Sequence, residues 1–552
     1  MASLSPSTST HLQRPAAPIP TDIAASSSNK LQLPAKTHSL ERRCSNLLQS
    51  CSSSSRLAEI HGHLIRSSLH QNHFLAARLL SCCFSLGRYS YASRFFGLLL
   101  HPDVFLFNVM IKGFVSAGFH GEALRFYCML LCGDSLPNDF TLPLVLKACS
   151  KLAAAGEGRT IHGHVLKLGY GSNIFIQTAL VDLYGTCWDA ADARKLFDRM
   201  TERDVVSWNA MVSAYVRSGS ILLAERLFDE MPVRNVNSWT AMIGGLMNAG
   251  DPKRALTAFR QMQLHGVRPD KMVIVAILSA ISNLGYLSSG KWVHDYIRKN
   301  AIPIDAFVGT ALIDMYSKSG SIRDARLAFQ ATKFKNTSCY NAMIFGLAVH
   351  GLGEEAISVF EEMKRNGIEI DDVTMIAVLT SCSHSGLVEE GLRFFETMRE
   401  LYGIDPRIKH HGCVVDLLGR AGRFAEAMEI VDSIEVDHVV MGTLAAACRT
   451  HGKTELAEEI AMRMSGLDAE NSGFYVWRAS VHAGNEEWEE AAEIRRRMKE
   501  RGIEKGAGCS WIEAGEKVHW FVASDHSHPR SKQIYCRLDE LYAVMGLLGK
   551  EG

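Results

Sequence analysis

The sequence lacks an excess of charge of either sign, because 59 Lys and Arg balance 59 Asp and Glu among its 552 residues. Binding many phosphates without regard to sequence requires surplus basic side chains. A strongly basic, sequence-blind nucleic-acid binder is therefore disfavoured, whereas a protein that reads bases is not. Apolar residues make up 47% and charged residues 21%, which excludes global disorder.

The sequence also lacks any C-x-x-C motif among its 14 cysteines. The cysteines are scattered, many at apolar helical positions such as Cys149 and Cys382, so we interpret them as reduced core residues in an intracellular compartment. No apolar run approaches the roughly 18 residues of a transmembrane helix. We therefore expect no membrane insertion.

Acidic residues are nearly absent from residues 1–37, where Asp22 is the single one. This segment is rich in Ser, Thr, Ala and Pro and has no continuous apolar core of a secretory signal. Such leaders are typical of organelle transit peptides, and a plain disordered tail is the alternative. The Met-Ala-Ser start and the few arginines favour an organellar location, a chloroplast more than a mitochondrion.

What the chain does contain is a repeated pattern of Ala, an aromatic residue four positions on and Met seven positions on. Spacing of i, i+4 and i+7 places the three on one helix face, so each copy predicts a buried stripe. The copies are Ala193, Phe197 and Met200; Ala224, Phe228 and Met231; Ala255, Phe259 and Met262; Ala356, Phe360 and Met363.

A second repeated pattern precedes the first, as in "WNAMVSAYVRSG", "GTALIDMYSKSG" and "YNAMIFGLAVHG". Its Gly predicts the end of one helix, and a polar turn begins the next. Each unit is thus a helix-turn-helix hairpin. We place the units at 38–72, 73–103, 104–138, 139–173, 174–204, 205–235, 236–270, 271–305, 306–336, 337–371, 372–407 and 408–437.

Stacked hairpins of this kind predict an all-α fold, a right-handed α-solenoid whose first helices line the concave surface and which continues into a helical C-terminal extension. A protein-binding scaffold such as a tetratricopeptide array is the alternative. Those arrays keep a 34-residue period, whereas these units vary in length between 30 and 36 residues.

Unequal units in this order resemble plant pentatricopeptide-repeat (PPR) proteins of the PLS class, in which standard, long and short repeats alternate. The segments "NVMIKGFVSAGFHGEALRFYCML", "PLVLKACSKLAAAGEGRTIHGHVLKLG" and "TALVDLYGTCWDAADARKLFDRM" are similar to a standard, a long and a short repeat. The end of the chain resembles the family's E and E+ extensions, which we place at 438–508 and 509–552. The resemblance covers about 38–547.

The resemblance implies a sequence-specific binder of single-stranded RNA in an organelle. The E/E+ ending implies recognition of sites for C-to-U RNA editing, with a DYW-type deaminase supplied in trans and small organellar editing-complex proteins as further partners. An organellar factor for RNA splicing, stability or translation without an editing role is the alternative.

In this family each repeat reads about one base with two residues. The first, here termed the reading residue, is near the start of the first helix, and the second, the closing residue, is the last of the unit. The resemblance pairs Asn108 with Asn138 (a pyrimidine), Thr178 with Asp204 (G), Asn209 with Asn235 (a pyrimidine), Thr240 with Asp270 (G), Thr310 with Asn336 (A) and Asn341 with Asp371 (U).

We assign no base to the other units. Pro143, Val275 and Ile376 are apolar at the reading position and Ala77 likewise has no group that could hydrogen-bond a base edge. Gly412 is at a reading position where the family commonly has a small polar residue or Ala. With the N-terminus at the RNA 5′ end, units 104–437 predict the motif Y-N-G-Y-G-N-A-U-N-N. The competing interpretation is that the Thr and Asn residues are only helix caps.

We expect no catalytic residue, metal or cofactor, and hence no enzyme. A zinc nucleobase deaminase needs H-x-E and P-C-x-x-C, and only the first half occurs, at His120 and Glu122. Related editing proteins continue into a deaminase domain near the point where this chain ends. The cluster of His410, His411 and Cys413 has no fourth ligand, so we interpret it as core or surface.

Overall fold

The computed structural model describes residues 35–133, 135–187, 190–434, 438–464, 472–484, 487–503, 509–514, 517–522 and 528–548. Residues 1–34 of the predicted leader lie outside the described residues. The chain divides into two compact units, Met1–Ile176 and Gln177–Gly552. Each unit is described by itself below.

The first unit is built from consecutive antiparallel helix pairs, and its last residues begin a helix, α9, that continues into the second unit. Its complete helices are α1 (Ala35–Gln49), α2 (Ser54–Arg66), α3 (His73–Ser85), α4 (Tyr89–Phe96), α5 (Val104–Ser116), α6 (His120–Cys132), α7 (Thr141–Leu152) and α8 (Ala155–Lys167).

The second unit repeats the same pairing over a longer stretch. Its helices are α9 (Ile174–Cys187), α10 (Ala190–Arg199), α11 (Val205–Arg217), α12 (Ile221–Glu230), α13 (Val236–Asn248), α14 (Pro252–Leu264), α15 (Lys271–Leu284), α16 (Leu287–Lys299), α17 (Ala306–Lys318), α18 (Ile322–Ala331), α19 (Thr337–Val349), α20 (Gly353–Arg365), α21 (Asp372–Ser385), α22 (Val388–Tyr402), α23 (Ile408–Arg420), α24 (Phe424–Ser433), α25 (His438–Thr450), α26 (Thr454–Met464), α27 (Ser472–Gly484), α28 (Trp488–Glu500) and α29 (Ser531–Leu548).

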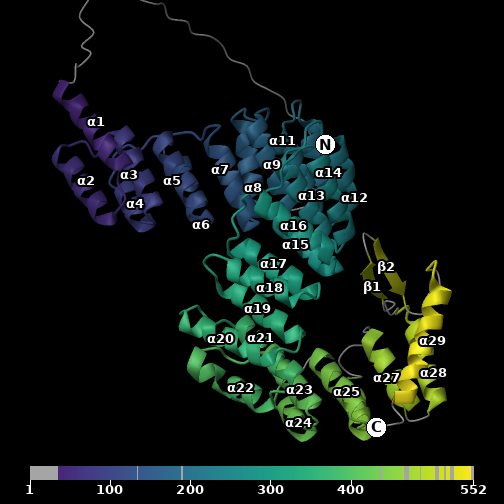
Figure 1. Cartoon of the computed structure of the whole chain (residues 1–552). Helices are drawn as coiled ribbons and strands as arrows, with labels where there is room; N and C mark the ends of the chain where they lie inside the picture. The colour runs from purple at the N-terminus through teal and green to yellow at the C-terminus, as the bar shows by residue number, and fades with distance from the viewer. Residues whose placement is uncertain are drawn as a thin grey trace, which may run out of the picture. The chain divides into compact units, whose positions relative to one another are not determined.

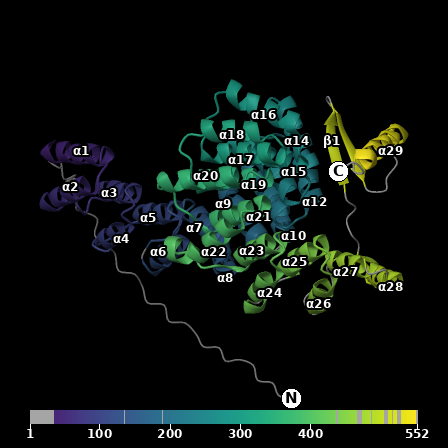
Figure 2. The same ribbon diagram turned by 60° about the horizontal axis from the view of Figure 1, so that its bottom comes forward.

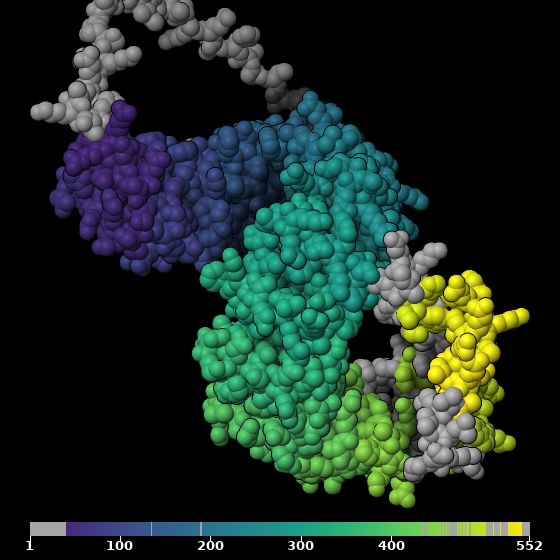
Figure 3. Space-filling view, in the orientation of Figure 1, coloured from purple at the N-terminus to yellow at the C-terminus, as the bar shows by residue number. Residues whose placement is uncertain are grey.

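Consecutive hairpins pack through their first helices. In the second unit α17 packs on α19, α19 on α21 and α21 on α23, so the first helices lie side by side (Figures 1 and 2). In the first unit α1 packs on α3 and α3 on α5. Side chains fill the spaces between successive pairs (Figure 3). This arrangement confirms the predicted all-α solenoid, in which stacking of neighbours buries a continuous core.

The predicted stripe is buried in all four copies, where every Ala, Phe and Met is at most 4% exposed. Two features at the first helices bring the hairpins together. Gly219 ends α11 with a φ of +72°, a conformation that other residues adopt only with strain. Gly245 allows α13 to approach α11, because a Cβ there would lie 2.6 Å from Val216 Cγ2.

The C-terminal extension contains an element that the sequence analysis did not predict. Strands β1 (Cys509–Ala514) and β2 (Lys517–Val522) pair antiparallel, with Trp511 opposite Trp520. Aromatic and β-branched residues at these positions favour strands over helices. The predicted helical extension therefore consists of helices α25 to α29 with this hairpin between them.

Cys149 and Cys382 are buried, as the sequence analysis expected, and burial raises the pKa of the Cys382 thiol to about 11. Neither is part of a disulfide bond, which agrees with their interpretation as core residues. Within the described part of the chain, no helix has the length and apolar character needed to cross a membrane.

Candidate nucleic-acid interface

Five of the six closing residues are the N-caps of the first helix that follows them. Each accepts a hydrogen bond through Oδ1 from the backbone N–H three residues on, at distances of 2.8 Å for Asp204, 3.0 Å for Asn235, 2.9 Å for Asp270, 3.1 Å for Asn336 and 2.8 Å for Asp371. Asn138 lies two residues before Phe140, the N-cap of α7, and its Oδ1 accepts the N–H groups of Phe140 and Thr141 at the start of that helix. Capping thus holds one oxygen of every closing residue.

The reading residues lie one turn deeper in their helices. Asn108, Thr178, Asn209, Thr240, Thr310 and Asn341 are each the fifth residue of α5, α9, α11, α13, α17 and α19. An N-cap precedes the first helical residue. The interpretation of these six residues as helix caps is therefore wrong, and it applies to the closing residues instead.

The three pairs whose reading residue is Asn are joined directly. Nδ2 of Asn108 donates to Asn138 Oδ1 at 3.1 Å. Nδ2 of Asn209 donates to Asn235 Oδ1 at 3.3 Å, and Nδ2 of Asn341 donates to Asp371 Oδ1 at 3.1 Å. The structure therefore brings these pairs together across 26 to 30 residues of chain.

The three pairs whose reading residue is Thr are not joined in this way. Among the described residues, no hydrogen bond links Thr178 to Asp204, Thr240 to Asp270 or Thr310 to Asn336. The hydroxyls of Thr240 and Thr310 donate instead to the carbonyls four residues earlier, at 2.8 Å and 2.7 Å. With its proton engaged, each oxygen can only accept further hydrogen bonds. Thr310 Oγ1 also lies 3.2 Å from Cys339 Sγ.

Two reading asparagines and one reading threonine carry polar atoms without a partner. Thr178 Oγ1, Asn209 Oδ1 and Asn341 Oδ1 are buried and accept or donate no hydrogen bond. Unsatisfied buried polar atoms are uncommon in folded proteins. Their presence at three reading positions is consistent with groups that pair only when a ligand is bound.

The charge of the closing residue Asp371 follows from its contacts. Burial by itself would raise the pKa of the Asp371 carboxyl, but hydrogen bonds from the hydroxyl and N–H of Thr374 and from Asn341 outweigh burial. The pKa is therefore lowered from its ordinary value, and the carboxylate is ionised at neutral pH. An ionised carboxylate only accepts hydrogen bonds.

A row of exposed apolar side chains accompanies the reading positions, and the sequence analysis did not single it out. Each member is three residues before a reading position, which places the two on the same helix face. The members are between 43% and 71% exposed: Phe74, Phe105, Phe140, Phe175, Val206, Met272, Phe307 and Val373. No sequence signal distinguishes them from core residues, because an apolar residue in a sequence does not reveal whether it is covered.

A basic side chain immediately before three closing residues folds back onto the preceding helix. Arg203 donates to the carbonyls of Phe197 and Asp198, both at 3.0 Å, and its guanidinium lies 4.7 Å from the Phe197 ring. Arg234 repeats these contacts on Phe228 and Asp229 at 2.9 Å.

Lys335 takes the same place, 4.9 Å from the Phe329 ring. A positive charge at a helix C-terminus is favourable. These three basic residues therefore hold the short loops that precede Asp204, Asn235 and Asn336.

The open reading positions are apolar or lack a side chain. Pro143, Val275 and Ile376 are half-buried, and Ala77 is buried. A Cβ added at Gly412 would lie 3.3 Å from Val440 Cγ2. None of these five residues has a side-chain donor or acceptor for a base edge.

Most residues that suggested metal or proton-transfer chemistry have structural partners, whereas Nδ1 of His120 is buried without a hydrogen-bond partner. The buried His410 accepts the Arg407 N–H at Nδ1 and hydrogen-bonds the Asp372 carbonyl through Nε2, both at 3.0 Å. Glu122 pairs with Arg125 rather than with His120. In the part of the chain that the structure describes, no three His, Cys, Asp or Glu side chains gather in a way that could hold a metal ion.

Comparison with family models matches both the array and the extension. The PPR repeat model matches residues 105–132, 178–205, 206–236, 237–267 and 373–402, and a PPR repeat family model matches 335–384. The E motif model matches residues 451–513, and the E+ motif model matches 518–543.

Relatives in Arabidopsis thaliana are similar over most of their length. A putative pentatricopeptide repeat-containing protein designated chloroplastic is 42% identical over 91% of this chain and 92% of its own. The chloroplastic protein ELI1 is 41% identical over 90% of this chain and 79% of its own. A pentatricopeptide repeat-containing protein designated mitochondrial is 38% identical over 90% of this chain and 77% of its own.

A solved structure shares the fold. The pentatricopeptide repeat protein PPR10, in complex with an 18-nt psaJ RNA element, aligns with a TM-score of 0.52 over 85% of this chain and 77% of its own. The two sequences are 16% identical, so the likeness concerns the fold alone.

Proposed function

The chain belongs to the pentatricopeptide repeat family and carries E and E+ motifs, and on this basis we propose that it is a sequence-specific single-stranded RNA-binding protein of an organelle. The observation that carries the proposal is the contact between reading and closing residues. Asn108, Asn209 and Asn341 each donate to the residue that ends their unit. Two side chains held together in this way can meet one base edge.

Capping gives each closing residue its donor or acceptor character. Because Oδ1 of Asn235 accepts the Ser238 N–H, its Nδ2 group remains to donate. Because Oδ1 of Asp371 accepts the Thr374 N–H, its second oxygen remains to accept. A free donor suits the ring nitrogen acceptor of cytosine or adenine, and a free acceptor suits the ring N–H of uracil or guanine.

The reading residues complete the assignment. Thr240 offers only an acceptor, since its proton is engaged within α13. Together with the Asp270 acceptor this suits guanine, whose edge presents two donors side by side. Thr310 with the donor of Asn336 suits adenine, which presents one acceptor and one donor. The proposed motif for units 104–437 is therefore Y-N-G-Y-G-N-A-U-N-N, read from the 5′ end.

The exposed apolar row supplies a sequence-independent part of the binding. Bases stack on aromatic and apolar side chains regardless of identity. Phe105, Phe175 and Phe307 lie three residues before Asn108, Thr178 and Thr310, on the same face of their helices. A base read by the pair can therefore rest against the preceding side chain, which supports an RNA ligand over a protein ligand.

Binding of synthetic RNA to the purified full chain tests this proposal. We expect RNA containing Y-N-G-Y-G-N-A-U-N-N to bind more tightly than the same bases in scrambled order. Equal affinity for both RNAs would mean that binding does not depend on base order, and it would favour the interpretation of the chain as a protein-binding scaffold.

We further propose that the chain recognises sites for C-to-U RNA editing and recruits a DYW-type deaminase in trans, together with small organellar editing-complex proteins. The E and E+ motif matches at 451–513 and 518–543 support this role. Loss of the protein in a plant is expected to abolish editing of at least one organellar cytidine. Normal editing at every site, with altered splicing, transcript abundance or translation, would support the alternative RNA function.

The proposed location rests on the composition of the N-terminal segment and on the locations designated for the relatives. The acid-poor segment 1–37 favours a chloroplast, and ELI1 is among the relatives that are designated chloroplastic. Another relative is designated mitochondrial. Import of the fluorescently tagged full chain into chloroplasts is the expected result, and exclusive import into mitochondria would overturn the chloroplast preference.

A further inference from the structure

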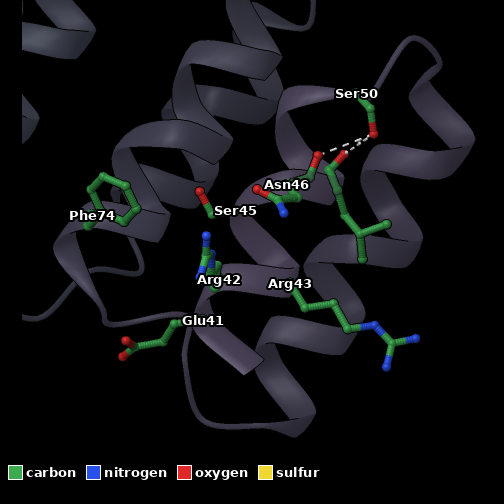
Figure 4. A pocket seen from close by; sticks show the side chains of 8 residues that line it. Glu41, Arg42, Arg43, Ser45, Asn46, Ser50 and Phe74 are labelled. Atoms are coloured by element: carbon green, nitrogen blue, oxygen red, sulfur yellow. Dashed lines mark hydrogen bonds between the residues drawn. The ribbon is translucent and has the colours of Figure 1, made fainter. Parts of the chain in front are cut away.

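The first base of the proposed motif falls to the pair of Asn108 and Asn138. A pocket of about 930 Å³ between α1 and α3 precedes this pair in the array (Figure 4). The pocket is lined in part by Phe74 of the apolar row, and the reading position of α3 is Ala77, which has no hydrogen-bonding group. Proposed reading by hydrogen bonds thus starts at Asn108.

The fourth base of the motif falls to Asn209 and Asn235, a pair of the same two residue types. Residue identity alone therefore assigns both pairs one preference, a pyrimidine. The hydrogen bonds of the two pairs differ, and the difference lies in the residue three positions after the closing residue. This third residue is Thr141 beside the first pair and Ser238 beside the second.

Thr141 ties the first pair into a closed network. Its hydroxyl donates to Asn108 Oδ1 at 2.6 Å, with Asn138 Oδ1 as a second acceptor at 3.0 Å, and its oxygen accepts the Asn138 N–H at 3.2 Å. Asn108 Nδ2 donates to Asn138 Oδ1 at 3.1 Å. Both ends of the Asn108 amide are thus held, and a half-turn that exchanges its Oδ1 and Nδ2 would break two hydrogen bonds.

Ser238 holds the closing residue of the second pair but not the reading residue. Its hydroxyl donates to Asn235 Oδ1 at 3.1 Å, and its oxygen accepts the Asn235 N–H at 3.2 Å. Asn209 Oδ1 is buried without a partner, and Asn209 Nδ2 makes the single bond of 3.3 Å to Asn235. A half-turn of the Asn209 amide therefore costs one long hydrogen bond.

The place of the third residue in its helix accounts for this contrast. Thr141 is the first residue of the buried face of α7 and is itself fully buried. Ser238 and Thr374 are each the third residue of their helices, α13 and α21. Thr374 bonds Asp371 and leaves Asn341 Oδ1 without a partner, so a threonine hydroxyl by itself does not make the contact.

A pair that can only donate matches one pyrimidine. Asn138 Oδ1 accepts from Asn108 and from the start of α7, so Asn138 Nδ2 remains to donate. Asn108 Oδ1 is occupied by Thr141, so the second N–H of Asn108 Nδ2 remains to donate. Cytosine presents two neighbouring acceptors, O2 and N3, whereas N3 of uracil carries a proton. Two donors side by side therefore suit cytosine, and against uracil one of them would face the N3–H group.

We infer that Thr141 is a positioning residue that makes the pair of Asn108 and Asn138 specific for cytosine, whereas Asn209 and Asn235 read cytosine and uracil alike. Asn209 can turn its Oδ1 towards the N3–H of uracil, and the held amide of Asn108 cannot. The inference rests on the proposed RNA-binding function and resolves the first base, so that the motif becomes C-N-G-Y-G-N-A-U-N-N.

Competition between RNAs that carry C or U at the first or at the fourth base tests the inference on the full chain. We expect C to be preferred over U at the first base by about fivefold or more, the scale of one hydrogen bond. Nearly equal affinity for C and U is expected at the fourth base. Thr141→Val keeps the shape of the side chain without its hydroxyl, and is expected to lower the preference at the first base to that at the fourth.

Two further variants separate positioning of Asn108 from capping of a helix. Thr374→Val removes the same contacts with a closing residue, Asp371, but none with a reading residue. We expect Thr374→Val and Thr141→Val to lower the unfolding temperature similarly, and Thr374→Val to keep its own preference for U. Thr141→Ser returns the hydroxyl and is expected to restore most of the preference for C.

The outcomes distinguish this inference from the proposed function. Equal binding of motif and scrambled RNA would overturn the proposed function itself. Binding of the motif with the same ratio of C to U affinity at the first and fourth bases would overturn this inference alone. A preference for C at the first base that survives Thr141→Val would also overturn it, because the network would then not be the cause.

Discussion

Asn341 donates through Nδ2 to Asp371 Oδ1 at 3.1 Å, although 30 residues separate them in the chain. The same Asp371 oxygen accepts the Thr374 N–H at 2.8 Å and so caps α21. One carboxylate thus joins the capping of a helix to the proposed reading of a base. The two roles are physically coupled, because the cap holds the side chain in one orientation.

Exchange of the closing acid changes the proposed base without removing the cap. Asp371→Asn is expected to shift preference at that base from U towards C, because a free acceptor becomes a free donor. The change in discrimination is expected to be about 1 kcal/mol or more, the scale of a well-made base contact. Asn caps helices as well as Asp does, so thermal unfolding should change little.

Asp305→Asn is the matched control for that exchange. Asp305 also caps a first helix, α17, but the reading position of its repeat is the apolar Val275. No change in base preference is expected in RNA competition. An equal shift in both variants would contradict base reading by the Asn341 and Asp371 pair.

The reading residue is tested separately with Thr240→Asn. The new amide can donate to Asp270, as Asn341 does to Asp371, so preference at this base is expected to move from G towards U. Competition between RNAs that differ at this base measures the effect, and Thr257→Asn on the exposed face of α14 is the control. No shift would mean that position 240 does not contribute to base reading.

Arg234 is expected to position Asn235. Arg234→Ala removes two hydrogen bonds to helix carbonyls and the contact with Phe228, and is expected to weaken discrimination at the base read by Asn209 and Asn235 alone. Arg234→Lys is expected to restore part of it, since Lys335 lies over Phe329 in the same manner.

RNA competition at each motif base checks the assignment of Arg234, with Arg226→Ala on the exposed face of α12 as the control. If Arg234 had a purely structural role, Arg234→Ala would weaken discrimination at every motif base equally and would lower the unfolding temperature. A loss at one base alone is the result that supports positioning.

Two adjacent glycines of α13 provide a test of helix packing. Gly245→Ala places a Cβ 2.6 Å from Val216 Cγ2, and is expected to lower the free energy of unfolding by about 1–3 kcal/mol. Gly244→Ala meets no atom within 4 Å, and is expected to raise it by about 0.5–1 kcal/mol. Chemical denaturation measures both, and a similar effect of the two substitutions would contradict the close approach of α11 and α13.

Stability is expected to fall below about pH 6.5 because of buried histidines. Burial lowers the pKa of His410 from its ordinary value of 6.5, although the Asp372 carbonyl opposes this. Nδ1 of His410 accepts the Arg407 N–H and can do so only when it is unprotonated. The unfolded chain therefore binds a proton more readily than the folded chain, and stability that is present above pH 6.5 is lost as the pH decreases.

The contribution of His410 is measured as the pH dependence of thermal unfolding between pH 8 and about pH 5. His410→Gln is expected to reduce the loss on acidification, and His63→Gln, at an exposed site of α2, is expected to leave it unchanged. An unchanged pH profile in His410→Gln would assign the loss to other groups, among them His61, His162 and His294, whose pKa values burial also lowers.

Sequence periodicity predicted the hairpins because their signals are local. Ala193, Phe197 and Met200 are close in the chain, so their spacing alone places them on one face, and the structure buries all three. The interpretation of Thr and Asn as caps failed because these residues lie too far into their units. Units 104–138, 205–235 and 236–270 begin at the first residues of α5, α11 and α13, so the fifth residue of each unit lies more than one turn after the cap position.

Other features depended on contacts between residues far apart in the chain. The paired strands at 509–514 and 517–522 have a short, mixed pattern that no helical period describes, and they were not predicted. The row of Phe74, Phe105 and Phe307 became apparent only from exposure, because an apolar residue in a sequence does not reveal whether it is covered.

The sequence by itself determined the solenoid, the order of its repeats and the identity of each pair of side chains that we propose to read a base. Only the tertiary structure decided that the asparagine pairs are hydrogen-bonded whereas the threonine pairs are not. The physical reason is the difference in side-chain length between Asn and Thr. An Asn amide in the second turn of one first helix spans the distance to the residue that caps the next, whereas the hydroxyls of Thr240 and Thr310 are satisfied by carbonyls of their own helices.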